Sequence, residues 1–185
     1  MKGSRTAVWI RVGFWLVVAV SIFGALWATR FGERVPSIYI MTGQSMEPTL
    51  AEGEYFVAWS PPDRIERGDL VIFRFARRAG DFHVLRRLAA LPGDTVAMDS
   101  GVVILNGKTQ PWPFDIASPG AWRSELAIEE NIYTWGPWVV PPDSAVLLSD
   151  RRDMFGWPDS RFLGFIPLDD ILARADFTLR GRQLH

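Results

Sequence analysis

Residues 12–29 form a long uncharged apolar run, which constrains the fold more than any other feature of the chain. The run lies at the short end of the length that a helix needs to cross a hydrocarbon core of roughly 30 Å. Lys2, Arg5 and Arg11 precede it, whereas the basic residues that follow are partly offset by Glu33. Because basic residues favour the cytoplasmic side, the pattern predicts a single span of the inner (plasma) membrane with a cytoplasmic N-terminus.

A basic start before an apolar core is also typical of a cleavable secretory signal. The run exceeds the usual core of about 7 to 15 residues, and no small-x-small site clearly follows it, so an anchor is favoured. We expect residues 1–34 to form the cytoplasmic N-terminus and anchor, and residues 35–185 to form one extracytoplasmic domain.

Beyond the anchor, short runs of Val, Ile, Phe and Tyr alternate with Gly, Pro and Asp. This pattern predicts a mainly β domain. The Asn106-Gly107 dipeptide predicts a hairpin turn, because both positions accept positive φ. A region rich in Pro, Trp, Ser and Glu indicates an inserted lobe at about 99–144. The expected strands are 35–41, 55–59, 70–75, 83–90, 95–98, 102–105, 145–149 and 164–167.

Composition excludes several classes of function. A net charge of −1 with dispersed arginines disfavours nucleic-acid binding. The absence of cysteine excludes disulfides, thiolate metal sites and a cysteine nucleophile.

Ser45 lies in a segment, residues 43–50, that is suited to nucleophilic chemistry. Gly43 permits a tight turn and close approach of a substrate carbonyl, and Pro48 restricts the residue before it. Such a turn can present a hydroxyl and a backbone N–H together, but a serine needs a base to remove its proton. The alternative is a turn serine without a catalytic role.

Four segments in order resemble the conserved boxes of the bacterial type I signal peptidases, peptidase family S26. The resemblance implies an antiparallel β domain with a small inserted cap lobe, which cuts signal peptides from exported preproteins without metal or cofactor. It implies that Ser45 is the nucleophile and supplies an oxyanion amide, with Gly43 in support and with Asp159 and Arg161 as an ion pair that braces the active site. An ordinary surface pair is the alternative for those two residues. The segments are GQSMEPTL (43–50), RGDLVIF (67–73), RRLAALPGD (86–94), and SDRRD (149–153) running into DSRFLGFIP (159–167).

The sequence departs from this family at the position of the general base. Arg86 stands where the family places a lysine, and arginine is effectively never deprotonated in proteins. The chain's lysines, Lys2 and Lys108, lie elsewhere. Residues 156–158 also replace a serine that orients the lysine amine in the family.

His83 is the alternative base, because imidazole titrates near neutrality. Three positions separate it from Arg86, so the two side chains face opposite sides of a regular strand. Two other functions therefore stay open. One is a catalytically impaired relative that binds export substrates or a membrane partner, and the other is a conjugation-type peptidase that processes a pilin-like substrate.

The nine tryptophans suggest contact with the lipid bilayer, because an indole ring suits the membrane interface. Packing in the core of a β domain explains them equally well. The tryptophans expected in loops are Trp112, Trp122, Trp135, Trp138 and Trp157.

Overall fold

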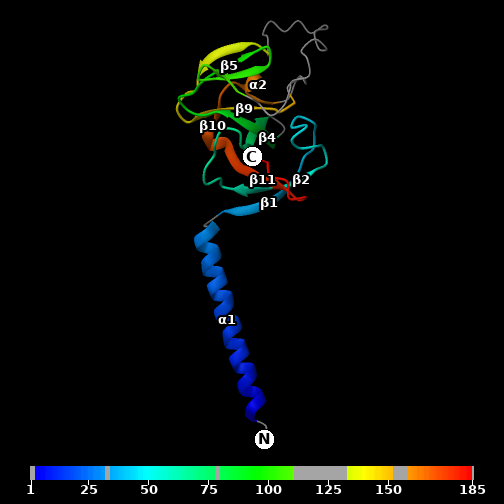
Figure 1. Cartoon of the computed structure of the whole chain (residues 1–185), viewed down its shortest axis with the longest axis vertical. Coiled ribbons are helices and arrows are strands. Elements are labelled where there is room, and N and C mark those ends of the chain that lie inside the picture. The colour runs from blue at the N-terminus through cyan, green and yellow to red at the C-terminus, as the bar shows by residue number, and fades with distance from the viewer. Residues whose placement is uncertain (1–2, 32–33, 78–79, 111–132, 152–157, 185) are drawn as a thin grey trace. The chain divides into compact units, whose positions relative to one another are not determined.

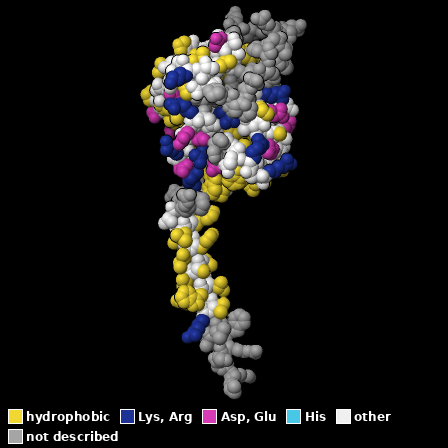
Figure 2. Space-filling view, viewed as in Figure 1, with side chains coloured by type: hydrophobic (Ala, Val, Ile, Leu, Met, Phe, Trp, Pro, Cys, Tyr) yellow, Lys and Arg dark blue, Asp and Glu magenta, His cyan; other side chains and the backbone are white. Residues whose placement is uncertain are grey.

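The computed structural model describes residues 3–31, 34–77, 80–110, 133–151 and 158–184. The chain divides into two compact units, 1–35 and 36–185. Helix α1 (Gly3–Phe31) dominates the first unit, and its segment Arg11–Thr29 is long and apolar enough to cross a membrane. In the coloured part of this helix, Figure 2 shows mostly hydrophobic side chains, with a basic side chain next to the grey end. The predicted apolar helix is therefore confirmed.

A seven-stranded sheet forms the base of the second unit (Figure 1), with strand order β1-β2-β11-β3-β4-β9-β10. The pairings of β11 with β2 and β3, of β3 with β4, and of β9 with β4 and β10 are antiparallel. The strands are β1 (Val35–Ile40), β2 (Tyr55–Ser60), β3 (Leu70–Arg77), β4 (Gly80–Ala90), β9 (Ser144–Leu148), β10 (Ile166–Pro167) and β11 (Ile171–Thr178).

A smaller antiparallel sheet has the order β7-β6-β5-β8. Asn106 and Gly107 connect β6 to β7 with φ of 51° and 75°, which confirms the predicted hairpin turn. The mainly β, antiparallel fold class is also confirmed. Residues 111–132 of the predicted inserted lobe lie outside the described residues. The remaining elements are β5 (Thr95–Asp99), β6 (Val102–Leu105), β7 (Lys108–Thr109), β8 (Trp135–Val139), the short helix α2 (Ser160–Leu163) and the 3-10 turn η2 (Leu168–Asp170).

Three strands, β7, β8 and β11, are absent from the prediction, and composition explains the omission of β8 and β11. In β11, small alanines occupy two of the inward positions and Arg174 and Asp176 alternate with them, so the middle of the strand lacks the branched and aromatic residues that favour β structure. In β8, Gly136 and Pro137 interrupt the pattern. Both strands are identified by their pairing partners rather than by their own composition.

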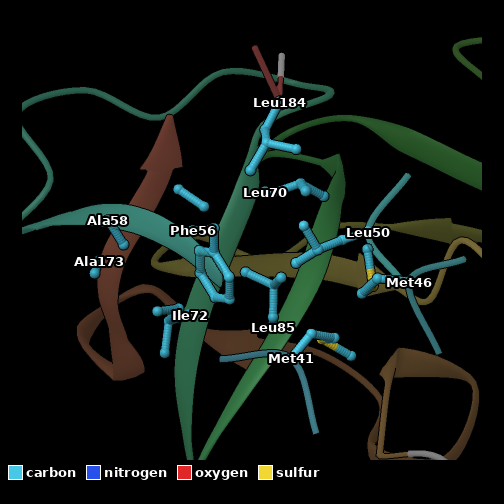
Figure 3. Close-up of a cluster of buried hydrophobic side chains, with 11 residues drawn as sticks. Met41, Met46, Leu50, Phe56, Ala58, Leu70, Ile72, Leu85, Ala173 and Leu184 are labelled. Atoms are coloured by element: carbon cyan, nitrogen blue, oxygen red, sulfur yellow. The ribbon is translucent and has the colours of Figure 1, made fainter. Parts of the chain in front are cut away.

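One hydrophobic cluster joins the large sheet to the loop that follows β1 (Figure 3). Met46 and Leu50 from this loop are fully buried beside Phe56 of β2 and Leu85 of β4. The cluster comprises Met41, Met46, Leu50, Phe56, Ala58, Leu70, Ile72, Leu85, Ala173, Ala175 and Leu184.

The tryptophans of β8 pack against a second cluster of buried residues. Trp135 and Trp138 stack with ring centroids 4.3 Å apart, and Trp138 meets Phe165 edge-on. Core packing therefore accounts for these two tryptophans. Trp112, Trp122 and Trp157 lie outside the described residues.

Candidate active site

The loop between β1 and β2 holds Ser45 in a fixed position. The burial of Met46 and Leu50 anchors the loop, and the Leu50 N–H donates to the Met46 carbonyl at 2.9 Å. The Arg151 N–H donates to the Ser45 carbonyl at 3.0 Å. Ser45 is 1% exposed, so it is buried and does not lie on an exposed turn.

Ser45 lines a cleft of about 360 Å³. Apolar side chains make up much of its wall, among them Tyr39 of β1 and Phe75 and Phe82 of the β3–β4 hairpin. A mostly apolar cleft with a few polar groups is the usual form of a binding site. Four residues predicted for the site line this one cleft: Gly43, Ser45, His83 and Arg86.

Arg86 projects from β4 to the serine. Its Nη1 donates to Ser45 Oγ at 3.0 Å and also to the Leu85 carbonyl. Its side chain is 2% exposed, and its Nε has no hydrogen-bond partner among the described residues. A guanidinium has only donors, so Ser45 Oγ is the acceptor in this contact.

The electrostatic surroundings of Arg86 disfavour its charge without removing it. Burial lowers the pKa of Arg86 to about 10, and the nearby Arg161 cation acts in the same direction. The carboxylates of Asp159 and Asp150 oppose the shift. A pKa of about 10 is still roughly three units above neutrality, so the guanidinium keeps its proton at pH 7.

His83 is exposed, although it also lines the cleft. The β3–β4 ladder runs in unbroken register past both His83 and Arg86. Their side chains therefore leave opposite faces of β4. Within the described part of the chain, no hydrogen bond joins His83 to Ser45.

Asp159 and Arg161 form a fully buried ion pair, with Arg161 Nη2 at 2.8 Å from Asp159 Oδ2. Asp159 also accepts from the hydroxyl of Ser149 at 2.7 Å and caps α2. Burial alone raises the pKa of Asp159, but the Arg161 cation and these hydrogen bonds outweigh it, so the pKa lies below its usual range. The alternative of an ordinary surface pair is therefore wrong.

A second buried pair was missed by the sequence analysis. Arg87 Nη2 and Nε contact Asp150 at 2.5 and 2.7 Å, and Thr49 from the serine loop donates to the same carboxylate. The pair thus connects the loop to β4. Its sequence signal is an arginine at an inward position of a strand, where a charged residue requires a partner.

No group of three or more His, Asp or Glu side chains placed to hold a metal ion occurs within the described residues.

Three comparisons relate the chain to known proteins. The family model described as signal peptidase, peptidase S26, matches residues 9–180. The chain is 32% identical over 174 residues to a probable signal peptidase I-2 of Synechocystis sp., an alignment that covers 90% of this chain and 71% of the relative. It is 30% identical over 149 residues to signal peptidase I of Bacillus caldolyticus, with 76% and 78% covered.

Among solved structures, a signal peptidase I from Enterococcus faecalis V583 aligns with a TM-score of 0.40 and 20% identity, over 59% of this chain and 94% of that one. The family match extends over most of the chain, including most of helix α1, the loop that holds Ser45 and the buried ion pairs. The chain therefore belongs to the signal peptidase family, peptidase S26, the serine endopeptidases that cleave signal peptides.

Proposed function

We propose that Ser45 is the nucleophile of a membrane-anchored signal peptidase that cleaves preproteins at the outer face of the membrane. The observation that carries this proposal is the position of Ser45 Oγ, in an apolar cleft and 3.0 Å from a buried side chain of β4. The family match supplies the class of reaction and of substrate.

The Ser45 backbone N–H is available to the reaction. None of the hydrogen bonds found among the described residues uses it as a donor. When Ser45 Oγ attacks the scissile carbonyl, this N–H can donate to the oxyanion that forms. Gly43, which is buried beside Ser45, leaves room for the substrate backbone.

Arg86 occupies the position of the family's lysine, and it acts in this proposal as a fixed cation. It orients Ser45 Oγ and stabilises negative charge that develops there, but it cannot accept the proton of Ser45. The proton passes to a base other than a lysine, and His83 is a poor candidate because its side chain leaves the opposite face of β4. Turnover should therefore be slow.

The donor role of Arg86 also favours a second candidate function. A relative that keeps the cleft and loses its base would bind export substrates without processing them. No feature of the described residues favours the third possibility, a conjugation-type pilin peptidase.

A cleavage assay tests the proposal. The full chain in detergent is incubated with a preprotein, and the products are identified by mass spectrometry. We expect slow cleavage after the signal peptide by the wild type, no cleavage by Ser45→Ala, and unchanged cleavage by His83→Ala. Cleavage by Ser45→Ala at the wild-type rate would exclude this nucleophile. Binding of the preprotein without any cleavage by the wild type would establish the second function instead.

A further inference from the structure

Among the described residues, the charges buried around Ser45 do not balance. Arg87 pairs with Asp150, and Arg161 pairs with Asp159. Arg86 contacts no carboxylate among the described residues, although both aspartates act on it at longer range. The buried set therefore carries one net positive charge, which resides on the side chain that reaches the serine. Its members are Arg86, Arg87, Arg161, Asp150 and Asp159, none more than 8% exposed.

A buried guanidinium without a carboxylate is an unfavourable arrangement. Desolvation of a cation costs several kcal/mol unless an opposite charge and hydrogen bonds offset it. Arg86 Nη1 donates two hydrogen bonds, whereas Nε is buried and has no hydrogen-bond partner among the described residues. Buried polar atoms without partners are rare, and each one calls for an explanation such as an absent ligand.

The cleft places this cation within reach of a ligand. Arg86 and Ser45 both line it, together with apolar side chains such as Tyr39 and Phe82. An occupant that complements the cleft is apolar along its length and carries one negative charge at the end that reaches Ser45.

We propose that this cleft binds the C-terminal carboxylate of a peptide, with Arg86 as the group that recognises it. The proposal deepens the function proposed for Ser45 and rests on it, because the released signal peptide is such a ligand. Water attacks the acyl ester, the bond from the acyl carbon to Ser45 Oγ breaks, Ser45 regains its proton, and the new carboxylic acid loses its proton to solvent. The resulting carboxylate lies beside Arg86.

A charged guanidinium distinguishes this product from its precursor. A carboxylate forms charge-assisted hydrogen bonds that are about twice as strong as those of a neutral carbonyl. The scissile peptide bond of the substrate is neutral, so the cleaved signal peptide should bind more tightly than the same sequence in the uncleaved preprotein. The enzyme should then be inhibited by its own product.

The test compares two forms of one labelled peptide. A hydrophobic peptide ending in Ala-Gln-Ala is prepared as the free acid and as the C-terminal amide, and binding to the full chain in detergent is followed by fluorescence anisotropy. We expect the acid to bind at least about tenfold more tightly, equivalent to about 1.4 kcal/mol. Equal affinities for acid and amide in the wild type would overturn the proposal by themselves.

Variants at Arg86 assign the preference. Arg86→Met removes the charge and should abolish the difference between acid and amide, while binding of the amide shows that the cleft is intact. Arg86→Lys, measured at pH 6, should retain a preference for the acid. An acid preference that persists in a folded Arg86→Met protein would contradict the role of Arg86. Sodium acetate should displace the acid peptide no better than sodium chloride at equal ionic strength, and stronger displacement would identify a general anion site instead.

The same experiment separates this inference from the proposed function. Binding is also measured with Ser45→Ala, where cleavage cannot contribute. An acid preference in a protein whose cleavage does not depend on Ser45 would contradict the proposed nucleophile alone. Cleavage that depends on Ser45, without an acid preference, would contradict the carboxylate site alone.

Discussion

Single residues around the serine are held by charges rather than by apolar packing alone. The Arg161 side chain donates to Asp159 and also to the hydroxyl of Ser149, all three being buried. Asp159 in turn accepts from the Ser149 N–H at 3.1 Å, which connects the residue after β9 to the N-cap of α2. Loss of either charged member removes the buried ion pair and leaves the other charge in the interior.

Asp159→Asn tests the contribution of this cluster to stability. Breaking a buried pair by removing one partner costs about 3–5 kcal/mol, so the free energy of unfolding at pH 7 should fall by roughly that amount. Because the pKa of Asp159 is lowered, its stabilising contribution is present above about pH 4 and is lost as the pH falls further. Chemical denaturation of both proteins at several pH values measures this.

The matched control is Asp170→Asn, which removes the partner of Arg74 in an exposed pair. Such pairs contribute about 0–1 kcal/mol, so this variant should unfold nearly as the wild type does. If Asp159→Asn and Asp170→Asn lower the free energy of unfolding equally, the buried pair stabilises the protein no more than the exposed pair does.

Among the secondary-structure elements, some strands can be predicted from local sequence patterns and others cannot. The β3 strand is recognisable because Val71, Ile72 and Phe73 are intrinsically strand-forming. The β11 strand lies between β2 and β3, and its alanines are buried in a hydrophobic cluster that includes residues from both neighbours. Its position depends on pairing across more than a hundred residues, which a local pattern does not contain.

The site divides in the same way. Sequence motifs predict four of the site residues, because each lies in one of the segments that resemble the family's conserved boxes. These residues are Ser45, Arg86, Asp159 and Arg161. The Arg87–Asp150 pair, and the lack of a carboxylate beside Arg86 in the part of the chain that the structure describes, depend on which buried charges meet in three dimensions. Of residues 156–158, predicted to replace the family's orienting serine, positions 156 and 157 lie outside the described residues.

Leu184 gives an element-scale prediction, because it joins the segment after β11 to the core below the serine loop. It is 2% exposed and lies in the cluster of Figure 3, whereas Leu179 is 54% exposed. Leu184→Ala should destabilise the domain by about 2–5 kcal/mol, and Leu179→Ala should change stability by no more than about 0.5 kcal/mol. Thermal unfolding followed by tryptophan fluorescence measures both. Similar melting temperatures for the two variants would contradict the burial of Leu184.

In the whole molecule, helix α1 is suited to hold the protein in the membrane, and the β domain contains the candidate active site. The signal peptidase family match and the apolar helix α1 together indicate a membrane-anchored protein. On the visible face of the domain, Figure 2 shows positive and negative side chains interspersed rather than gathered by sign. Attachment to the membrane should therefore depend on the helix and not on charge.

Extraction of membranes tests this division. The full chain should stay in the membrane pellet at alkaline pH and at high salt, because α1 is held by apolar burial that salt does not screen. A variant with Val18→Arg and Ile22→Arg should be extracted more readily, since each arginine near the centre of a span costs about 2.5–3.5 kcal/mol. Full release of the wild type by salt alone would contradict anchoring by α1.

The most direct test of the account is the pH dependence of single-turnover preprotein cleavage by the wild type and by Arg86→Lys. A lysine buried at this position can lose its proton, and general-base catalysis contributes about 10²–10⁴-fold. We predict that Arg86→Lys cleaves at least about tenfold faster than the wild type, with a rate that rises with pH as the amine deprotonates. A wild-type enzyme that cleaves as fast as Arg86→Lys at every pH would contradict the claim that Arg86 holds Ser45 without accepting its proton.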